Sequence, residues 1–170
     1  MSPSFLHYLK SMPYRPGALS NLIPEGQIVL RPLLFHGDLI GILEVYHECF
    51  GRLPPIMPMR RALLKHRWLL ACVSHNHELK IIGFMIFAVR RRRKQVHVLR
   101  IAVTKQFRRH GIASQMLQDL IAHAKGYSIY AKVPEKNLAA LELFKKLGFN
   151  SRLIRCPEKD QDTILFFRHG

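Results

Sequence analysis

The sequence is poor in cysteine and has no long apolar run. Its three cysteines, Cys49, Cys72 and Cys156, show no paired spacing, which argues against a disulfide framework and a zinc ribbon and predicts a reducing, cytoplasmic location. The ten histidines form neither an HExxH motif nor a cluster with cysteine, so we expect no metal. No stretch approaches the roughly 18 consecutive apolar residues of a membrane-spanning helix, so we expect no membrane span.

Acidic residues are also scarce. The chain has 27 lysines and arginines against 11 aspartates and glutamates, a net charge of +16, which predicts a broadly positive surface. Such a surface repels polyamines and basic tails and favours a ribosome-associated or acidic protein partner. The basic run 90–94 has two interpretations: a solvated hairpin tip that protects strand edges, or a site that docks RNA phosphates or an acidic tail.

Residues 1–26 mix proline and glycine with scattered apolar residues, which predicts an extended arm. The arm lacks an uninterrupted apolar core, so a cleaved secretory signal is not expected, whereas an organelle-targeting segment stays open. Residues 27–170 are predicted to form one domain, since a chain of 170 residues with 48% hydrophobic content can bury a substantial core. The patterns predict, in order, a strand, two helices, three strands, a helix, a strand, a helix and two strands.

The stretch 96–120 contains the first functional signal. An apolar run over residues 97–103 ends in a basic turn, and a helical pattern follows Gly111. The first turn of a helix leaves backbone N–H groups without partners, and these favour an anion. Gly111 lets backbone approach a ligand, Ala113 keeps the helix start open, and Arg108 and Arg109 add charge that can pair with phosphate. The alternative is a surface turn between a core strand and an amphipathic helix.

A second stretch, residues 133–149, carries the pattern Asn-x-x-Ala-x-x-Leu-Phe-x-x-x-Gly-Phe. Together with Arg-x-x-Gly-x-Ala over residues 108–113, it resembles the GNAT superfamily of acetyl-CoA-dependent N-acetyltransferases, especially the branch that acetylates ribosomal-protein and other protein N-termini. The likeness is strong over residues 94–150. It implies an α+β fold with a mixed, mostly antiparallel sheet of about seven strands and about four helices. Strands 4 and 5 of this fold splay apart to hold CoA.

The resemblance assigns the pyrophosphate to amides of the loop 106–113 and the pantetheine arm to the main chain of residues 101–103. It also places the Asn137 side chain near the cofactor, although Asn137 can equally be a plain helix cap. The residues that it implies for cofactor binding are Ile101, Ala102, Val103, Arg108, Arg109, His110, Gly111, Ile112, Ala113, Ser114, Asn137 and Phe144.

His97 and Tyr130 are the candidate catalytic residues. An imidazole with a pKa of about 6.5 can take a proton from an amine, but a buried histidine is also commonly a core residue. Lys132 stands where some relatives place a histidine, and it would be a poor base without desolvation. Phe144 replaces a tyrosine that many relatives use as proton donor, and the central strand lacks their glutamate. Tyr130 can substitute as donor only if its hydroxyl reaches the sulfur.

These observations predict an enzyme that transfers an acetyl group from acetyl-CoA to a primary amine, such as a protein or peptide N-terminus or a lysine. The amine would attack directly in a ternary complex. The alternative is a catalytically weak or inactive protein on the same scaffold that binds CoA or RNA. Phe144, the missing glutamate and the charge of +16 favour the alternative, whereas the sequence has no recognisable RNA-binding motif.

Overall fold

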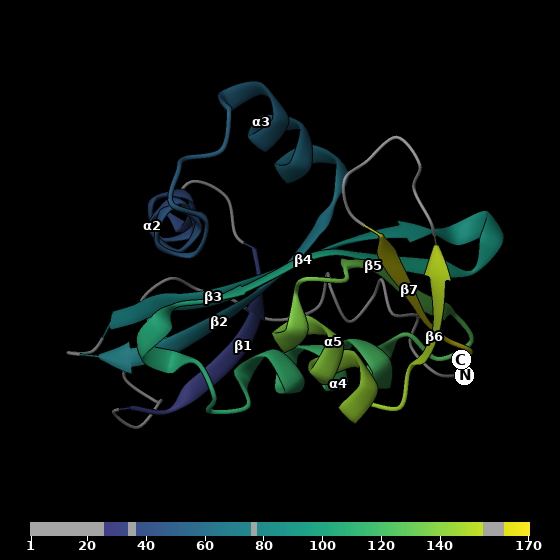
Figure 1. Ribbon diagram of the computed structural model, residues 1–170. Helices are drawn as coiled ribbons and strands as arrows, with labels where there is room; N and C mark the ends of the chain where they lie inside the picture. The colour runs from purple at the N-terminus through teal and green to yellow at the C-terminus, as the bar shows by residue number, and fades with distance from the viewer. Residues whose placement is uncertain (1–25, 34–36, 76–77, 155–161) are drawn as a thin grey trace.

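The computed structural model describes residues 26–33, 37–75, 78–154 and 162–170 (Figure 1). The arm predicted over residues 1–26 lies outside these ranges except for Gly26. The described residues form a seven-stranded sheet and four α-helices. Their bounds, with two short 3₁₀ turns, are β1 (Ile28–Pro32), α2 (Asp38–Phe50), α3 (Ile56–Lys65), β2 (Arg67–His75), β3 (Glu78–Arg90), η2 (Arg91–Arg93), β4 (Gln95–Val103), η3 (Lys105–Phe107), α4 (Ile112–His123), β5 (Ser128–Pro134), α5 (Leu138–Lys146), β6 (Asn150–Ile154) and β7 (Thr163–Arg168).

The strand order is β1-β2-β3-β4-β5-β7-β6. Neighbouring strands run antiparallel except β4 and β5, which are parallel. A parallel pair needs a crossover, and α4 supplies it. The prediction of a mixed, mostly antiparallel sheet in an α+β fold is confirmed, and so is the predicted order of elements.

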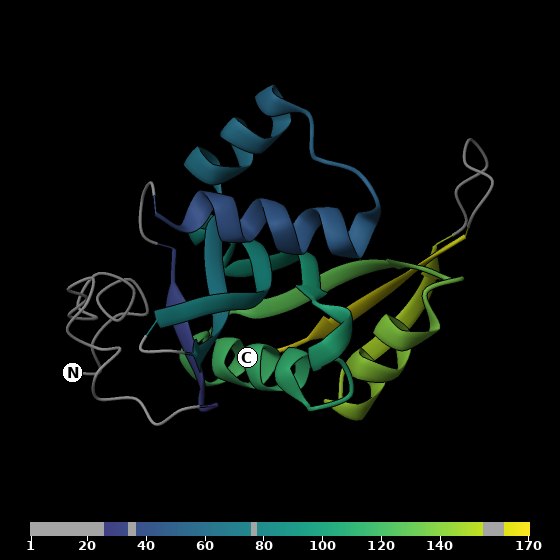
Figure 2. The ribbon, with the colours of Figure 1, turned by 90° about the vertical axis from the view of Figure 1, so that its left-hand side faces the viewer.

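Helices α2 and α3 lie on one face of the sheet, and α4 and α5 lie on the other (Figures 1 and 2). Each face has its own core: Ile42, Val45, Leu70 and Phe84 are buried on the α2 face, and Met85, Met116, Leu117 and Phe166 on the α4 face. Strand β3 contributes to both cores, which explains its long apolar run. In the described part of the chain, no helix is both long and apolar enough to span a membrane.

Aspartate is a favoured helix-cap residue, yet Asp38 does not cap α2. The cap residue is Gly37, and Asp38 is the first residue inside the helix. The Asp38 carboxylate instead accepts two hydrogen bonds from the Arg31 guanidinium on β1, at 2.9 and 2.6 Å, and both side chains are buried. A buried carboxylate gains more from a charged, bidentate partner than from one backbone N–H. The pair therefore fixes α2 against the edge of the sheet.

Strand β4 contains a bulge. Val98 pairs with Phe87 and Arg100 pairs with Ile86, so Leu99 is an extra residue opposite β3. Because successive side chains alternate between faces, an extra residue changes which face the following side chains occupy. His97 lies on the α2 face before the bulge, and after it Arg100 lies on that face as well.

Candidate functional site

The site begins where β4 and β5 separate. Their pairing runs from Gln95 with Ser128 to Val98 with Ala131. Beyond that point β4 continues without β5 to Val103, while β5 goes on pairing with β7. The free edge of β4 therefore presents backbone groups that no neighbouring strand satisfies. A cavity of about 870 Å³ lies at this opening.

The floor of the cavity is the loop that leads into α4. Arg109 and Gly111 both have left-handed backbone conformations, with φ of 67° and 78°. The first helical bond runs from the Gln115 N–H to the Gly111 carbonyl at 2.9 Å, so the three N–H groups before Gln115 have no helical partner. They belong to the cavity-lining residues 112–114. A Cβ atom at Gly111 would meet nothing within 4 Å, so the cavity stays open above the helix start.

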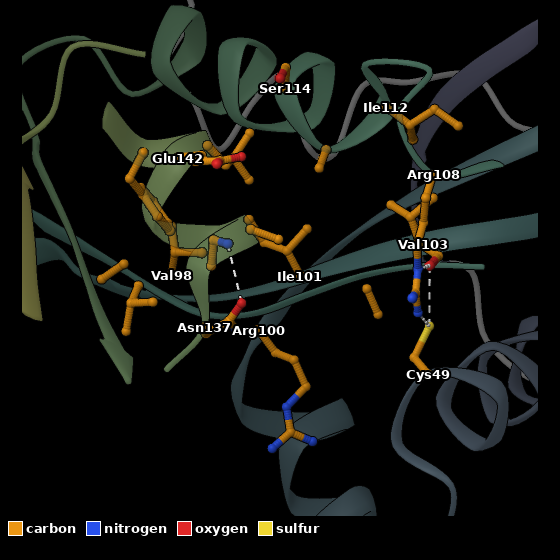
Figure 3. A pocket seen from close by; sticks show the side chains of 18 of the residues that line it. Cys49, Val98, Arg100, Ile101, Val103, Arg108, Ile112, Ser114, Asn137 and Glu142 are labelled. Carbon is orange, nitrogen blue, oxygen red and sulfur yellow. Dashed lines mark hydrogen bonds between the residues drawn. The ribbon is translucent and has the colours of Figure 1, made fainter. Parts of the chain in front are cut away.

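The side chain of Arg108 bonds to the end of β4. Its Nε donates to the Val103 carbonyl at 2.9 Å, and one terminal nitrogen lies 3.7 Å from the Cys49 sulfur of α2 (Figure 3). The Cys49 thiol donates to the same carbonyl at 3.3 Å. Sequence reasoning expected Arg108 to pair with phosphate, but the guanidinium here ties the loop to α2. Cys49 was not anticipated, because no local pattern links it to a loop 59 residues later.

Helix α5 and the residue before it supply part of the remaining cavity wall. Asn137 is the N-cap of this helix, and its Oδ1 accepts from the Ala140 N–H at 3.2 Å. Asn137 also lines the cavity, so the two interpretations of this residue are compatible. Phe144 is buried, with its ring 5.1 Å from that of Phe149 and 5.2 Å from that of Phe166. It packs as a tyrosine ring would and has no hydroxyl to donate a proton.

Every residue predicted to bind the cofactor lines the cavity except His110. The exposed His110 ring lies outside the lining, and its Nδ1 is 2.8 Å from the Arg108 carbonyl oxygen. Arg109 lies 3.8 Å from Glu142 of α5, but both side chains are largely exposed, so this ion pair adds little stability. The arginine is therefore available to a ligand. In the described residues, no group of three or more His, Cys, Asp or Glu side chains could hold a metal ion.

His97 and Tyr130 lie together on the α2 face, although they do not line the cavity. The two residues pair across β4 and β5, and their rings stack with centroids 4.3 Å apart. Burial, followed by the positive charges of Arg90 and Lys132 and by His66, lowers the pKa of His97 below its usual value. The imidazole is therefore neutral near pH 7, as a proton acceptor must be.

Their position relative to the opening matters for chemistry. The next pair along the strands, Val98 with Ala131, is the last pair before β4 and β5 separate, and both of its members line the cavity. His97 and Tyr130 thus stand one residue from the apex of the opening. Lys132 is exposed to solvent and lacks the burial that a lysine base needs.

Sequence reasoning missed Arg100. This residue lines the cavity and extends towards the α2 side, away from the helix that carries Ser114 (Figure 3). Its guanidinium donates to the Tyr46 hydroxyl and lies 5.2 Å from the Tyr46 ring centroid and 5.0 Å from that of Phe50. Only the bulge at Leu99 brings Arg100 to this face, and a bulge has no clear sequence signal.

Comparison with known proteins agrees with this geometry. Residues 37–149 match the model of the acetyltransferase (GNAT) family. No curated protein matches the chain by sequence. The fold is similar to that of the ribosomal-protein-S18-alanine N-acetyltransferase of Escherichia coli, with a TM-score of 0.69 and 19% identity over 84% of this chain and 94% of that one.

Two similar structures contain acetyl-CoA. Arabidopsis thaliana NAA60 in complex with acetyl-CoA has a TM-score of 0.69 and 17% identity, covering 84% of this chain and 99% of that one. The yncA protein of Salmonella typhimurium, with its cofactor acetyl-CoA, has a TM-score of 0.63 and 18% identity, covering 84% of this chain and 94% of that one. The family match spans most of the described fold and includes every residue that lines the cavity. The chain belongs to the acetyltransferase (GNAT) family.

Proposed function

We propose that the chain binds acetyl-CoA in the cavity between β4 and β5 and transfers its acetyl group to a primary amine. The observation that carries this proposal is the continuity of the opening between the strands with the unpartnered N–H groups at the start of α4. A pyrophosphate suits the helix start, because unpaired amides and the helix dipole both favour an anion. The pantetheine amides suit the free edge of β4 at residues 101–103, which offers backbone hydrogen bonds.

His97 and Tyr130, one residue from the apex of the opening, suit direct transfer of the acetyl group. The acceptor amine would attack the acetyl carbonyl carbon as the C–S bond breaks, and its proton would pass to the His97 imidazole directly or through water. The lowered pKa of His97 keeps the ring neutral and ready to accept. The departing CoA thiolate would take up a proton from Tyr130 or from solvent, since Phe144 has no proton to give.

A protein or peptide acceptor is supported by one of the similar structures and by the net charge of the chain. The E. coli neighbour acetylates the alanine of ribosomal protein S18, as its name states. The net charge of +16 favours an encounter with ribosomal RNA or an acidic protein. We therefore propose a protein N-terminus or lysine as the acceptor and the cytoplasm as the place of action.

Calorimetry with acetyl-CoA is the first test. We expect saturable binding by the folded protein, and no binding at high micromolar concentration would overturn the proposal. If acetyl-CoA binds, peptides with free N-termini are then assayed for acetylation. A His97→Gln variant should lose most of the turnover while it keeps its affinity for acetyl-CoA, and unchanged turnover would remove His97 as the base.

A catalytically weak CoA-binding or RNA-binding protein is the second candidate. Phe144 favours it, because this side chain fills the tyrosine's place in the aromatic cluster without a proton donor. It predicts acetyl-CoA or salt-sensitive RNA binding with no transfer to a broad panel of amines. Turnover that rises in a Phe144→Tyr variant would show that only the proton donor limits an active site that is otherwise complete.

A further inference from the structure

The Arg100 guanidinium is held in place before any ligand arrives. The Tyr46 hydroxyl accepts one of its hydrogen bonds, and the rings of Tyr46 and Phe50 lie about 5 Å from its central carbon. A guanidinium carries five N–H donors, so one bond to a hydroxyl leaves most of them available. Because the rings already restrict the side chain, a ligand that binds it loses less conformational entropy.

Arg100 lacks a carboxylate partner within the described part of the chain. The ion pairs found there join Arg31 to Asp38, Arg109 to Glu142 and His123 to Asp119. Arg100 is nevertheless one of the residues that line the cavity. A planar guanidinium matches a carboxylate in a bidentate arrangement, and such charged pairs are among the strong hydrogen bonds.

The charged groups that act on His97 on the α2 face are cationic. Arg90 and Lys132 both act on His97 by their positive charge, and no acidic residue is among the groups that shift its pKa. Glu48, at the end of α2, already accepts a hydrogen bond from the Lys105 backbone N–H. A cationic acceptor side chain would meet repulsion here, whereas an anionic one would be attracted.

From this geometry we propose that Arg100 is a carboxylate-binding subsite for the acceptor. The substrate class is an amine that carries a carboxylate close to it, foremost a peptide N-terminus with an acidic side chain in its first residues. The amine would lie beside His97 while the carboxylate pairs with the Arg100 guanidinium. This inference rests on the proposed acetyl transfer and adds the charge of the acceptor to it.

The test compares two amidated peptides that differ only by aspartate or asparagine at the second and third positions. We expect the KM of the acidic peptide to be lower by about tenfold or more, with similar kcat, as for a hydrogen bond between charged groups. Arg100→Gln should bring the two KM values within about twofold, and Arg100→Lys should keep part of the preference. Equal KM values in the natural protein, or a preference that survives Arg100→Gln, would overturn the subsite.

Two controls distinguish the carboxylate subsite from the proposed acetyl transfer on which it rests. Arg152→Gln removes the same charge from an exposed position on β6, which is three strands from β4 in the sheet, so it should keep the preference. N-acetylated versions of both peptides, titrated by calorimetry, measure carboxylate binding without catalysis. If no peptide is acetylated but the acidic product binds more tightly and Arg100→Gln abolishes the difference, the subsite stands and acetyl transfer fails. A free aspartate that outcompetes the acidic peptide would locate the recognised carboxylate in an amino acid instead.

Discussion

Replacing Gly111 by alanine should separate ligand binding from backbone strain, because the chain contains a matched control. Gly111 and Gly126 flank the crossover helix α4, and both have φ of +78°, with no atom within 4 Å of where an added Cβ would lie. At either position, alanine should lower the free energy of unfolding by about 1 kcal/mol, because it must adopt a left-handed backbone conformation. Each variant should therefore melt about 2–4 °C lower than the natural protein, as expected for a chain of this size.

The two variants should differ in their affinity for acetyl-CoA. Gly111 lines the cavity and Gly126 does not. A methyl group at Gly111 would keep an anion from the start of α4 and remove one hydrogen bond to a charged group, about 1.5–3 kcal/mol. That loss corresponds to a Kd about 10–150-fold higher, measured by calorimetry. Equal affinities in Gly111→Ala and Gly126→Ala would refute the placement of the phosphates at this loop.

Three further predictions concern stability. Asn137→Ala should lower the free energy of unfolding by about 1 kcal/mol through loss of the helix cap, while Asn137→Asp should retain most of it, as measured by urea denaturation. Acidification should destabilise the protein as the pH falls below about 6.5, because the unfolded chain takes up protons that the lowered pKa values of His97 and His66 resist in the folded state. His97→Gln should flatten that pH dependence in denaturation series, and an unchanged slope would contradict the assignment. Asp38→Ala should cost about 3–5 kcal/mol by leaving Arg31 charged and buried, and the double variant with Arg31→Met should recover part of the loss in the same assay.

The loop that we propose for phosphate could be located in the sequence because its elements are local. Strand β4, its basic loop and α4 follow one another in the chain, and Gly111 falls where the helix must start. The Asn137 helix follows the same logic, since a cap residue and the pattern after it are both contained in one segment. Short-range signals of this kind specify the elements and where each one begins.

Contacts between segments that are far apart in the sequence could not be predicted. Asp38 has the sequence character of a helix cap, yet a buried arginine from β1 competes successfully for its carboxylate. Arg108 has the character of a phosphate ligand, yet its guanidinium reaches the Val103 carbonyl and Cys49. In both cases the local pattern identified a charged group correctly, and the folded chain supplied a partner that no spacing could reveal.

The bulge at Leu99 explains how one strand serves both halves of the site. Before it, Val96 and Val98 pack in the core under α4 while His97 lies on the α2 face. With strict alternation, residue 100 would follow Val98 into that core, where its guanidinium would be buried without a partner. The extra residue instead places Arg100 on the same face as His97 and leaves residues 101 and 103 packed towards α4. The bulge thus puts the proposed base and the proposed carboxylate ligand on one face of the sheet, and it puts residues 101 and 103, which line the cavity, on the other.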